Sequence, residues 1–301
     1  MCNCIQETER PLKTRAYKVV DVFTSLPLKG NPVAVILDAE GLQTETMQGI
    51  ARWTNLSETT FLLPPTRPEA DYRLRIFTPQ SELPFAGHPT LGSAFAALEA
   101  GVVPAHKEEL VQECGVGLVK LQVRSQGGER RLSFGLPPAQ LTSLDTPEVL
   151  ELEAILGHEV LREAQPAIVN VGAVWVVAQL PSVQALLALR PNHGRSAEFE
   201  RRLGANGLSI FAICQGGDKA LEVRSFAPSC GVPEDPVCGS GNGSIAVFLR
   251  ERGLLPRIGL SYLAGQGQCV GRDGRVAVKL EGSGFSIGGN CVTCVDGTLK
   301  L

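Results

Sequence analysis

Three short polar segments interrupt apolar sequence, and each holds a side chain that can exchange a proton. Glu58 stands in a Ser-Glu-Thr sequence, His88 in Gly-His-Pro-Thr and Asp235 in Glu-Asp-Pro-Val. A carboxylate or an imidazole can act as a general acid or base when a substrate reaches it. On residue type alone, a carboxylate at the position of Glu58 is more often a solvated turn residue, and His88 could be a helix cap. The segments therefore indicate candidate proton-transfer groups without deciding their use.

Two of these segments lead into apolar stretches of small residues that predict buried helices. We expect one helix over residues 89–100 and another over 242–251, both apolar nearly all round. Pro89 fits the first turn of the first helix, where the missing amide hydrogen costs nothing. Two helices buried on all sides indicate that each is wrapped by other elements.

The residues at these helix starts favour anion binding. Backbone amides of Gly87 would point ahead of the first helix, and those of Gly239 and Gly241 ahead of the second. Helix N-termini of this kind hold carboxylates and phosphates. The hydroxyl of Ser240 and that of Thr90 or Ser93 would add donors. Neither segment matches a Walker loop or a dinucleotide fingerprint, because the lysine of the first and the ribose carboxylate of the second do not follow.

A repeated motif connects the two helix starts. Arg-x-Phe-x-Pro, followed by a further proline, begins at Arg75 and again at Arg224, and each copy precedes one of the two predicted helices. A repeat spaced by about half the chain indicates two related domains, since solenoid units recur at much shorter intervals. We expect the domains to face each other across a pseudo-twofold axis, so that both helix starts converge on one cleft.

Composition excludes several classes of protein. Of the 301 residues, 44% are hydrophobic and 20% are charged, which is ordinary for a globular protein with a core. The net charge of −3 gives no electrostatic case for nucleic acid or for an anionic membrane. No apolar run is long enough to span a bilayer, and Met1 to Arg15 lack the apolar stretch of a signal peptide. We therefore expect a cytoplasmic protein.

The nine cysteines do not predict a metal site. Cys2 and Cys4 lie in a polar N-terminus. Cys291 and Cys294 have the spacing of a zinc knuckle, but no second pair of ligands accompanies them, and structural zinc sites need four. The alternating run around them favours buried strand thiols, which should be reduced in the cytoplasm. We expect no metal.

Patterning predicts an α+β fold of two pseudo-symmetric domains, each a β-barrel-like sheet wrapped around a central α-helix. Short alternating runs indicate many half-buried strands. Further helices are expected over 44–55, capped by Thr44, and over 149–156 and 183–189. A glycine-rich break at 125–129 suggests the boundary. The expected domains are then 16–125, completed by 286–301, and 126–285.

An ordered series of motifs closely resembles the PhzF-like phenazine-biosynthesis proteins. They are Asp21-Val22-Phe23-Thr24, Gly30-Asn31-Pro32, Asn55-Leu56-Ser57-Glu58-Thr59, Arg75-x-Phe77-Thr78-Pro79, Gly87-His88-Pro89-Thr90, Glu234-Asp235-Pro236-Val237-Cys238-Gly239-Ser240 and Gly265-Gln266-Gly267. This resemblance implies a diaminopimelate epimerase-like fold, an active site between the domains, chemistry without a cofactor, and a homodimer.

The resemblance also implies roles for individual residues. Glu58 would be the acid/base that carries the proton, with His88 and Asp235 as its partners in the catalytic group. Binding of the substrate would fall to the remaining motif residues: Asn31, Gly87, Pro89, Thr90, Cys238, Gly239, Ser240 and Gly241. From its residues alone, the segment around Asn31 is as well explained as a simple turn.

Cysteine placement narrows the chemistry. Two-thiol epimerases place a cysteine before each central helix, whereas this chain has Ala86 at the first place and Cys238 at the second. A symmetrical two-thiol racemase is therefore not favoured. The amide dipoles of the second helix would favour the thiolate of Cys238, so we expect a reactive thiol there.

The leading hypothesis is a cofactor-independent isomerase that moves a proton within a small carboxylate-bearing metabolite. Burial of Glu58 between the domains would raise its pKa towards working pH, which suits a group that both takes and returns a proton. Alternatives are a racemase or epimerase that uses Cys238 with Glu58, a hydroxy-amino-acid dehydratase, and a non-catalytic member that binds a metabolite or a protein.

Overall fold

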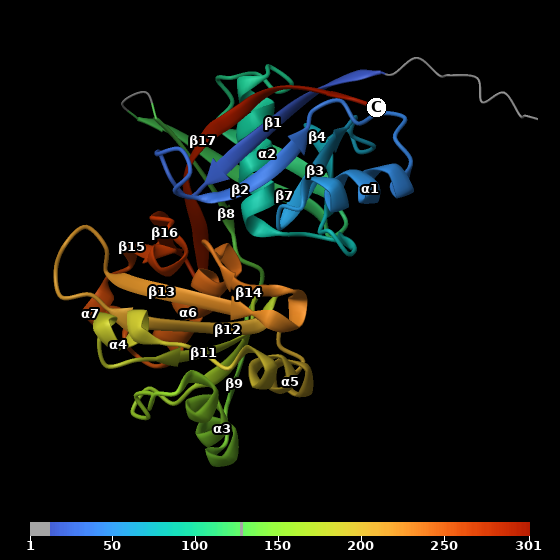
Figure 1. Cartoon of the computed structure of the whole chain (residues 1–301). Helices are drawn as coiled ribbons and strands as arrows, with labels where there is room; N and C mark the ends of the chain where they lie inside the picture. The colour runs from blue at the N-terminus through green and yellow to red at the C-terminus, as the bar shows by residue number, and fades with distance from the viewer. Residues whose placement is uncertain (1–12, 127–128) are drawn as a thin grey trace, which may run out of the picture.

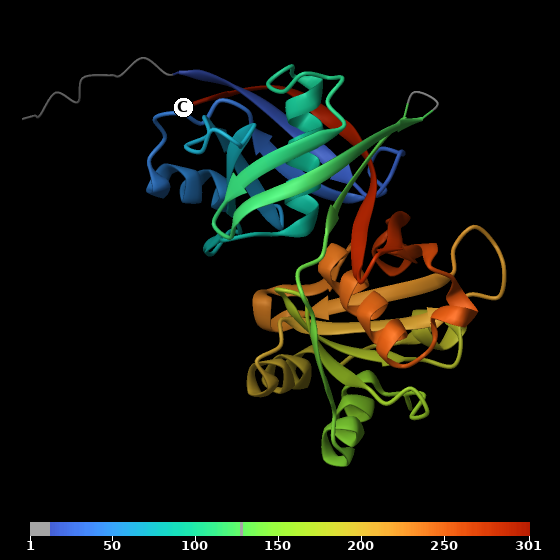
Figure 2. The ribbon, with the colours of Figure 1, turned by 180° about the vertical axis from the view of Figure 1, so that it is seen from behind.

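The computed structural model describes residues 13–126 and 129–301, so Cys2 and Cys4 lie outside the described part. The chain forms two halves, one above the other in Figure 1 and seen from behind in Figure 2. Each half is a curved sheet around one helix. The α+β fold of two pseudo-symmetric domains, predicted from the sequence, is confirmed.

The N-terminal half is a closed barrel of eight strands. Going round the barrel, the strands are β1 (Thr14–Val22), β2 (Asn31–Ile36), β3 (Glu58–Leu63), β4 (Tyr72–Phe77), β6 (Glu109–Cys114), β7 (Gly117–Gln126), β8 (Glu129–Gly135) and the long last strand β17 (Gly284–Lys300), which pairs with β1. The two-residue strand β5 (Glu82–Leu83) pairs with the edge of β4.

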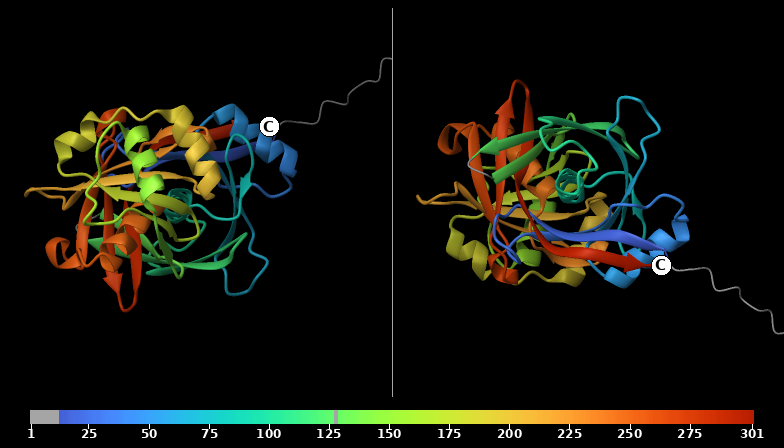
Figure 3. Two further views of the ribbon diagram at one scale, coloured as in Figure 1. Left: turned by 90° about the horizontal axis from the view of Figure 1, so that it is seen from below. Right: turned by 90° about the horizontal axis from the view of Figure 1, so that it is seen from above.

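Helix α2 (Gly87–Glu99) runs through this barrel, and Figure 3 shows it nearly end-on inside the ring of strands. Eleven consecutive residues, from His88 to Leu98, are buried, as the apolar sequence indicated. Helix α1 (Thr44–Thr54) lies outside the barrel on β3 and buries Met47, Ile50 and Ala51. The predicted cap is wrong: α1 starts at Thr44, whose hydroxyl accepts a hydrogen bond from Arg75 instead.

The C-terminal half wraps its own sheet around α6 (Gly239–Glu251). Its strands are β9 (Gln140–Ser143), β10 (Ala167–Asn170), β11 (Val174–Gln179), β12 (Gly207–Ile213), β13 (Leu221–Ala227), β15 (Ser261–Gln266), β16 (Gly274–Glu281) and the first residues of β17, with the short strand β14 (Val232–Asp235) paired to β13. The smaller helices are α3 (Thr146–Leu156), α4 (Val183–Ala188), α5 (His193–Leu203), α7 (Leu255–Ile258) and the 3₁₀ turns Pro228–Cys230 and Gln268–Val270.

Strand directions repeat between the halves. β2 runs parallel to β3 as β11 does to β12, and β4 runs parallel to β6 as β13 does to β15. The two Arg-x-Phe motifs lie at equivalent places, on β4 and on β13. The sequence repeat therefore marks a structural repeat, as predicted.

Several helices depart from the sequence-based expectation: α2 begins two residues and α6 three residues earlier than predicted, and the short α7 was not predicted. Helix α3 begins three residues earlier than predicted, because Asp145 and Glu148 form a capping box at its start. Helix α5 was not predicted at all. Its surface is largely charged, and the core receives little more than Phe199 from it. The available signals were the cap residue Asn192 and the left-handed Gly204 that ends the helix.

β17 belongs to both halves. Gly284 to Gly288 pair with β16, Ser286 to Asn290 pair with β8, and the remainder pairs with β1. Strand β8 pairs with β7, so one sheet crosses the boundary predicted at 125 and 126. We propose that the chain passes between the halves at residues 136–139, between β8 and β9 (Figure 2).

Close packing of α2 against the barrel makes a testable prediction. A Cβ at Gly92 would lie 2.4 Å from a Val33 methyl carbon and 2.9 Å from one of Val22. Gly92→Ala should therefore destabilise the fold by about 1–3 kcal/mol through overpacking. Gly49 is the matched control on α1, exposed and with no heavy atom within 4 Å of such a Cβ. Gly49→Ala should stabilise by about 0.5–1 kcal/mol.

Thermal unfolding of both variants, followed by far-UV circular dichroism, checks this pair. An unchanged midpoint for Gly92→Ala would show that α2 does not rest directly on β1 and β2.

Candidate active site

Both central helices begin at the junction of the two halves. The side chain of Asn31, at the start of β2, donates one hydrogen bond to Asp235 Oδ1 and another to the Val237 carbonyl, each 3.0 Å long. These bonds join the N-terminal barrel to the segment that leads into α6. Asn31 is buried, so the predicted site role is compatible with its position, and a simple exposed turn is not.

Glu58 and His88 face each other beside this bridge. Glu58 opens β3 and His88 is the second residue of α2, and their Oε2 and Nε2 atoms lie 3.3 Å apart. Their side chains are 16% and 8% exposed. Neither of these two atoms makes a well-aligned hydrogen bond with any residue that the structure describes. Buried polar atoms with free capacity are typical of sites that complete their bonds with a ligand.

Burial sets the protonation of this pair. It raises the pKa of Glu58 from 4.5 to about 7, against a smaller lowering by the Ser57 hydroxyl. It lowers the pKa of His88 from 6.5 to about 4, although Asp235 and the Pro32 carbonyl act in the opposite direction. At neutral pH the imidazole is therefore neutral, and the contact is not an ion pair. Glu58 then titrates near neutral pH, so both of its protonation states are accessible.

Asp235 completes the group of predicted acid/base residues. It ends β14, and its Oδ1 accepts hydrogen bonds from Asn31 and from the Val237 amide, the latter 3.1 Å long. Burial raises the pKa of Asp235 from 3.8 to about 6; His88 lowers it and the Glu58 carboxylate raises it further. Three residues from two halves of the chain thus affect one another's charge.

Cys238 does not behave as the sequence suggested. Its thiol caps α6 by accepting a hydrogen bond from the Gly241 amide at 3.3 Å, and it lies 3.6 Å from the Ser240 hydroxyl. Burial, followed by the charge of Asp235, raises the pKa of this thiol well above its ordinary value of 9.0. The expectation of a thiolate is therefore wrong, because desolvation outweighs the amide dipoles.

Glycine allows close packing at both helix starts. A Cβ at Gly87 would lie 3.0 Å from the ring of Phe134, and one at Gly239 would lie 3.1 Å from the ring of Phe23. A Cβ at Gly241 would lie 2.6 Å from the Ser209 hydroxyl. The glycines let each helix start lie against the barrel wall, with its first amides directed ahead of the helix.

Other predicted binding residues take different positions. Pro89 stands in the first turn of α2, as expected, and is buried. The buried Thr90 hydroxyl accepts a hydrogen bond from Gln112, so it is already engaged within the barrel. The Ser240 hydroxyl accepts one from the indole of Trp175 at 3.0 Å. The substrate-binding roles of these residues stay predictions.

Two residues that position parts of the site were not among the site residues predicted from the sequence. Trp175 positions Ser240, and Gln266 holds the turn before α6. The side chain of Gln266 accepts hydrogen bonds from the Cys238 amide and from Asn242, and it donates to the Asp235 carbonyl. The Gly265-Gln266-Gly267 motif was the available signal, since it belongs to the series that carries the family resemblance.

Within residues 13–126 and 129–301, no cluster of three or more His, Cys, Asp or Glu side chains could hold a metal ion. Cys291 and Cys294 both lie on β17, the first buried and the second partly buried. No helix in this part of the chain is both long and apolar enough to cross a membrane.

Comparisons place the chain among known proteins. The family model for phenazine biosynthesis-like protein matches residues 20–297. The protein named Antisense-enhancing sequence 1 from Schizosaccharomyces pombe is 38% identical over 94% of this chain and 97% of its own length. Trans-2,3-dihydro-3-hydroxyanthranilate isomerase from Pseudomonas fluorescens is 36% identical, covering 95% of this chain and 99% of that enzyme.

A solved structure shows the same fold. The PhzF-family phenazine biosynthesis protein of Bacillus anthracis superposes with a TM-score of 0.86 at 24% sequence identity, over 96% of this chain and 100% of that one.

The raised pKa of Glu58 predicts a pH-dependent cost to stability. Its pKa is about 7 in the fold and 4.5 ordinarily, so the folded state binds the proton more tightly between these values. Stability is therefore lost as the pH rises from 4.5 through 7, by up to about 3 kcal/mol for this group. Glu58→Gln removes that loss, and its thermal midpoint should exceed that of the native chain more at pH 8 than at pH 5.

Glu69→Gln, at an exposed carboxylate, is the control and should show no such difference. A Glu58→Gln midpoint that differs equally from the native one at both pH values would contradict the raised pKa.

Proposed function

The chain belongs to the phenazine biosynthesis-like protein family and is an isomerase, and from this premise we propose that it moves a proton within a small carboxylate-bearing substrate without a cofactor. The observation that carries the proposal is the Glu58 carboxyl, which lies buried at the junction beside His88 with a pKa of about 7. A group with that pKa accepts and returns a proton at neutral pH with little cost in either direction.

In the proposed reaction, Glu58 takes a proton from a substrate carbon. The C–H bond breaks, its proton moves to a Glu58 oxygen, and the electron pair enters the conjugated system that ends in the substrate carboxylate. The protonated Glu58 then returns the proton to a different carbon. Atoms and charge balance within the substrate and the one carboxyl group, so the cycle needs no redox partner.

The two helix starts supply the charge stabilisation that this step needs. The first amides of a helix have no intrahelical acceptor. At α6, Cys238 takes the amide of Gly241. In the proposal, the amides of Gly239 and Ser240 at the start of α6 and those of Gly87 and His88 at the start of α2 would receive the substrate carboxylate. Amides fixed ahead of the reaction stabilise negative charge as it develops on the substrate carboxylate.

His88 and Asp235 have complementary parts in the proposal. The neutral imidazole of His88 can either donate a hydrogen bond to a polar substrate group or accept one from it, whereas a charged imidazolium could only donate. Asp235, held by Asn31, would bind a hydroxyl or amino group and so orient the substrate against Glu58. Trans-2,3-dihydro-3-hydroxyanthranilate, which the Pseudomonas relative isomerises by its name, is the substrate to try first.

The alternatives differ from this proposal in observable ways. A racemase using Cys238 would need a thiol that ionises readily, and the raised pKa of Cys238 argues against it. A dehydratase would release water, so its product would differ in mass from the substrate. A non-catalytic member would bind the compound unchanged. The homodimer implied by the resemblance and the cytoplasmic location indicated by composition belong to the same proposal.

Loss of the proton carrier tests the proposal directly. Glu58→Gln should lower kcat on trans-2,3-dihydro-3-hydroxyanthranilate, or on another carboxylate substrate that the native chain turns over, by about 10²–10⁴-fold or more, because one group performs both transfers. Binding of the substrate should change little. Turnover in heavy water should place deuterium in the product, measured by mass spectrometry, unless the substrate's own proton is returned without exchange.

Glu69→Gln is again the exposed control. Full activity of Glu58→Gln on a substrate that Asp235→Asn no longer converts would move the proton transfer to the C-terminal half and overturn the assignment.

Cys238 provides a second test, aimed at the thiol alternative. Cys238→Ser keeps a good capping side chain at the start of α6. If the thiol is not the base, kcat/KM should remain within about tenfold of the native value, below the range expected for removal of a general base. Cys291→Ser, a buried thiol on β17, is the control. A loss as large as that of Glu58→Gln would instead favour the cysteine-assisted racemase.

A further inference from the structure

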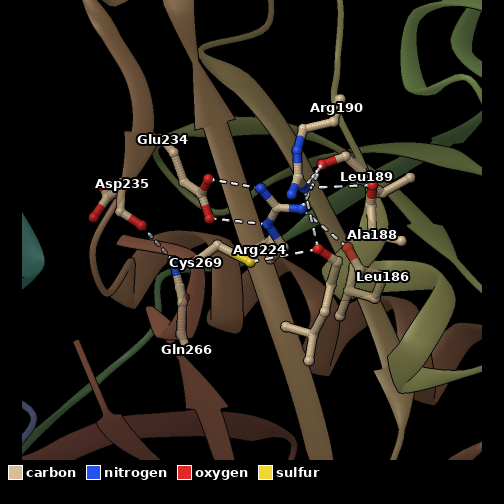
Figure 4. A network of polar contacts seen from close by, with 10 residues as sticks. Leu186, Ala188, Leu189, Arg190, Arg224, Glu234, Asp235, Gln266 and Cys269 are labelled. Carbon is tan, nitrogen blue, oxygen red and sulfur yellow. Dashed lines mark hydrogen bonds and ion pairs between the residues drawn. The ribbon is translucent and has the colours of Figure 1, made fainter. Parts of the chain in front are cut away.

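Arg224 is a buried arginine, and each of the three nitrogens of its guanidinium donates at least one hydrogen bond. On β13, only 4% of it is exposed. Its Nε and Nη2 donate to the two carboxylate oxygens of Glu234 at 2.9 and 2.8 Å, and its Nη1 donates to the carbonyls of Leu186 and Leu189, each at 3.0 Å (Figure 4). Such a bidentate contact fixes the orientation of the carboxylate as well as its distance from the guanidinium.

The carboxylate that Arg224 holds belongs to the residue before Asp235. Successive side chains on a strand point to opposite faces, and Glu234 and Asp235 are consecutive on β14. Figure 4 shows Glu234 turned towards Arg224 and Asp235 turned away from it. Gln266 adds a hydrogen bond to the Asp235 carbonyl at 3.0 Å. Strand β14 spans four residues and pairs with β13, and these side-chain contacts add to that pairing.

The N-terminal half contains an equivalent arginine–glutamate pair that is less buried. Arg75 on β4 donates to both oxygens of Glu82 at 2.7 Å, and its guanidinium lies 5.0 Å from the centre of the Phe77 ring. The Arg224 guanidinium lies 4.9 Å from that of Phe226. Side chains of the Arg75 pair are 24% and 39% exposed, against 5% and 13% for Arg224 and Glu234. Exposed pairs contribute little, whereas breaking a buried pair is costly.

We propose that Arg224 is a positioning residue that does not touch the substrate. Its bidentate contact with Glu234 fixes strand β14 and so holds Asp235 beside Asn31 and His88. This proposal depends on the proposed function only for the role of Asp235 in the reaction.

A shift of β14 would be visible in the titration of Asp235. The groups that face this carboxylate are Glu58 from β3, His88 from α2, Asn31 from β2 and Cys238 from the start of α6. Together with burial they raise its pKa to about 6. If the contact between Arg224 and Glu234 is weakened, the Asp235 carboxylate becomes more solvated. Its pKa should then fall towards the ordinary value of 3.8.

Arg224→Lys tests the proposal, because lysine keeps the charge and loses the bidentate contact. Arg75→Lys is the matched control in the equivalent motif. The Asp235 carboxyl, labelled with ¹³C and assigned with Asp235→Asn, is titrated by NMR in the native chain and both variants. Arg224→Lys should lower its midpoint by about 0.5 pH units or more, and Arg75→Lys should leave it in place. No substrate is needed for this measurement.

An unmoved midpoint in Arg224→Lys, with or without a loss of thermal stability, would overturn the proposal and leave the pair a purely structural one. Should Arg224→Lys fail to fold, Glu234→Gln loosens the same contact from the other side at nearly equal volume, and the same criterion applies to it.

Turnover separates this proposal from the proposed function. Displacement of Asp235 should reduce kcat/KM on the order of 10- to 100-fold in Arg224→Lys, as small displacements in active sites do, with less than about a twofold change in Arg75→Lys. A moved titration with unchanged turnover would support the positioning role of Arg224 and refute the part that the proposed function gives to Asp235.

Discussion

Water is largely excluded from the Glu58 carboxylate because the start of α2 lies over it, and this burial is the constraint on which the site depends. A solvated glutamate would be ionised at neutral pH and would hold a proton only briefly. Removing water raises its pKa to about 7, and the same burial keeps His88 neutral. Protonation at the site is therefore set by where the elements lie, and the fold is less stable at neutral pH because of it.

Assembly of the three acid/base residues requires the two halves to stay together. β17 belongs to both sheets, and Asn31 joins the N-terminal barrel to the turn before α6 with two hydrogen bonds. Neither half alone contains the three acid/base residues, since Glu58 and His88 come from one and Asp235 from the other. A shared strand limits how far the halves can separate, and a buried amide bridge fixes their register at the site.

The two copies of the structural repeat share the same contacts but differ in how deeply these contacts are buried. Both copies have an arginine paired with a glutamate beside a phenylalanine, and both have glycine against an aromatic ring at the helix start. The copies differ in burial. Around Arg75 the pair is partly solvated, whereas around Arg224 it is closed off and adjoins Asp235. The helix starts differ as well, with Ala86 at α2 and the protonated thiol of Cys238 at α6.

Local patterns in the sequence determined much of this protein. The apolar helices around Leu91 and Ile245, the repeated arginine motif and the glycines before each helix predicted two barrels, because periodicity and turn chemistry are properties of neighbouring residues. The grouping of Glu58 with His88 and Asp235 was implied by the family resemblance of the ordered motifs. Tertiary structure alone decided the rest. The polar helix α5, the partners of Gln266 and the passage between the halves depend on contacts distant in sequence. The pKa of Cys238 moved in the direction opposite to that expected, because desolvation depends on every group around the thiol, and a sequence motif specifies only the adjacent ones.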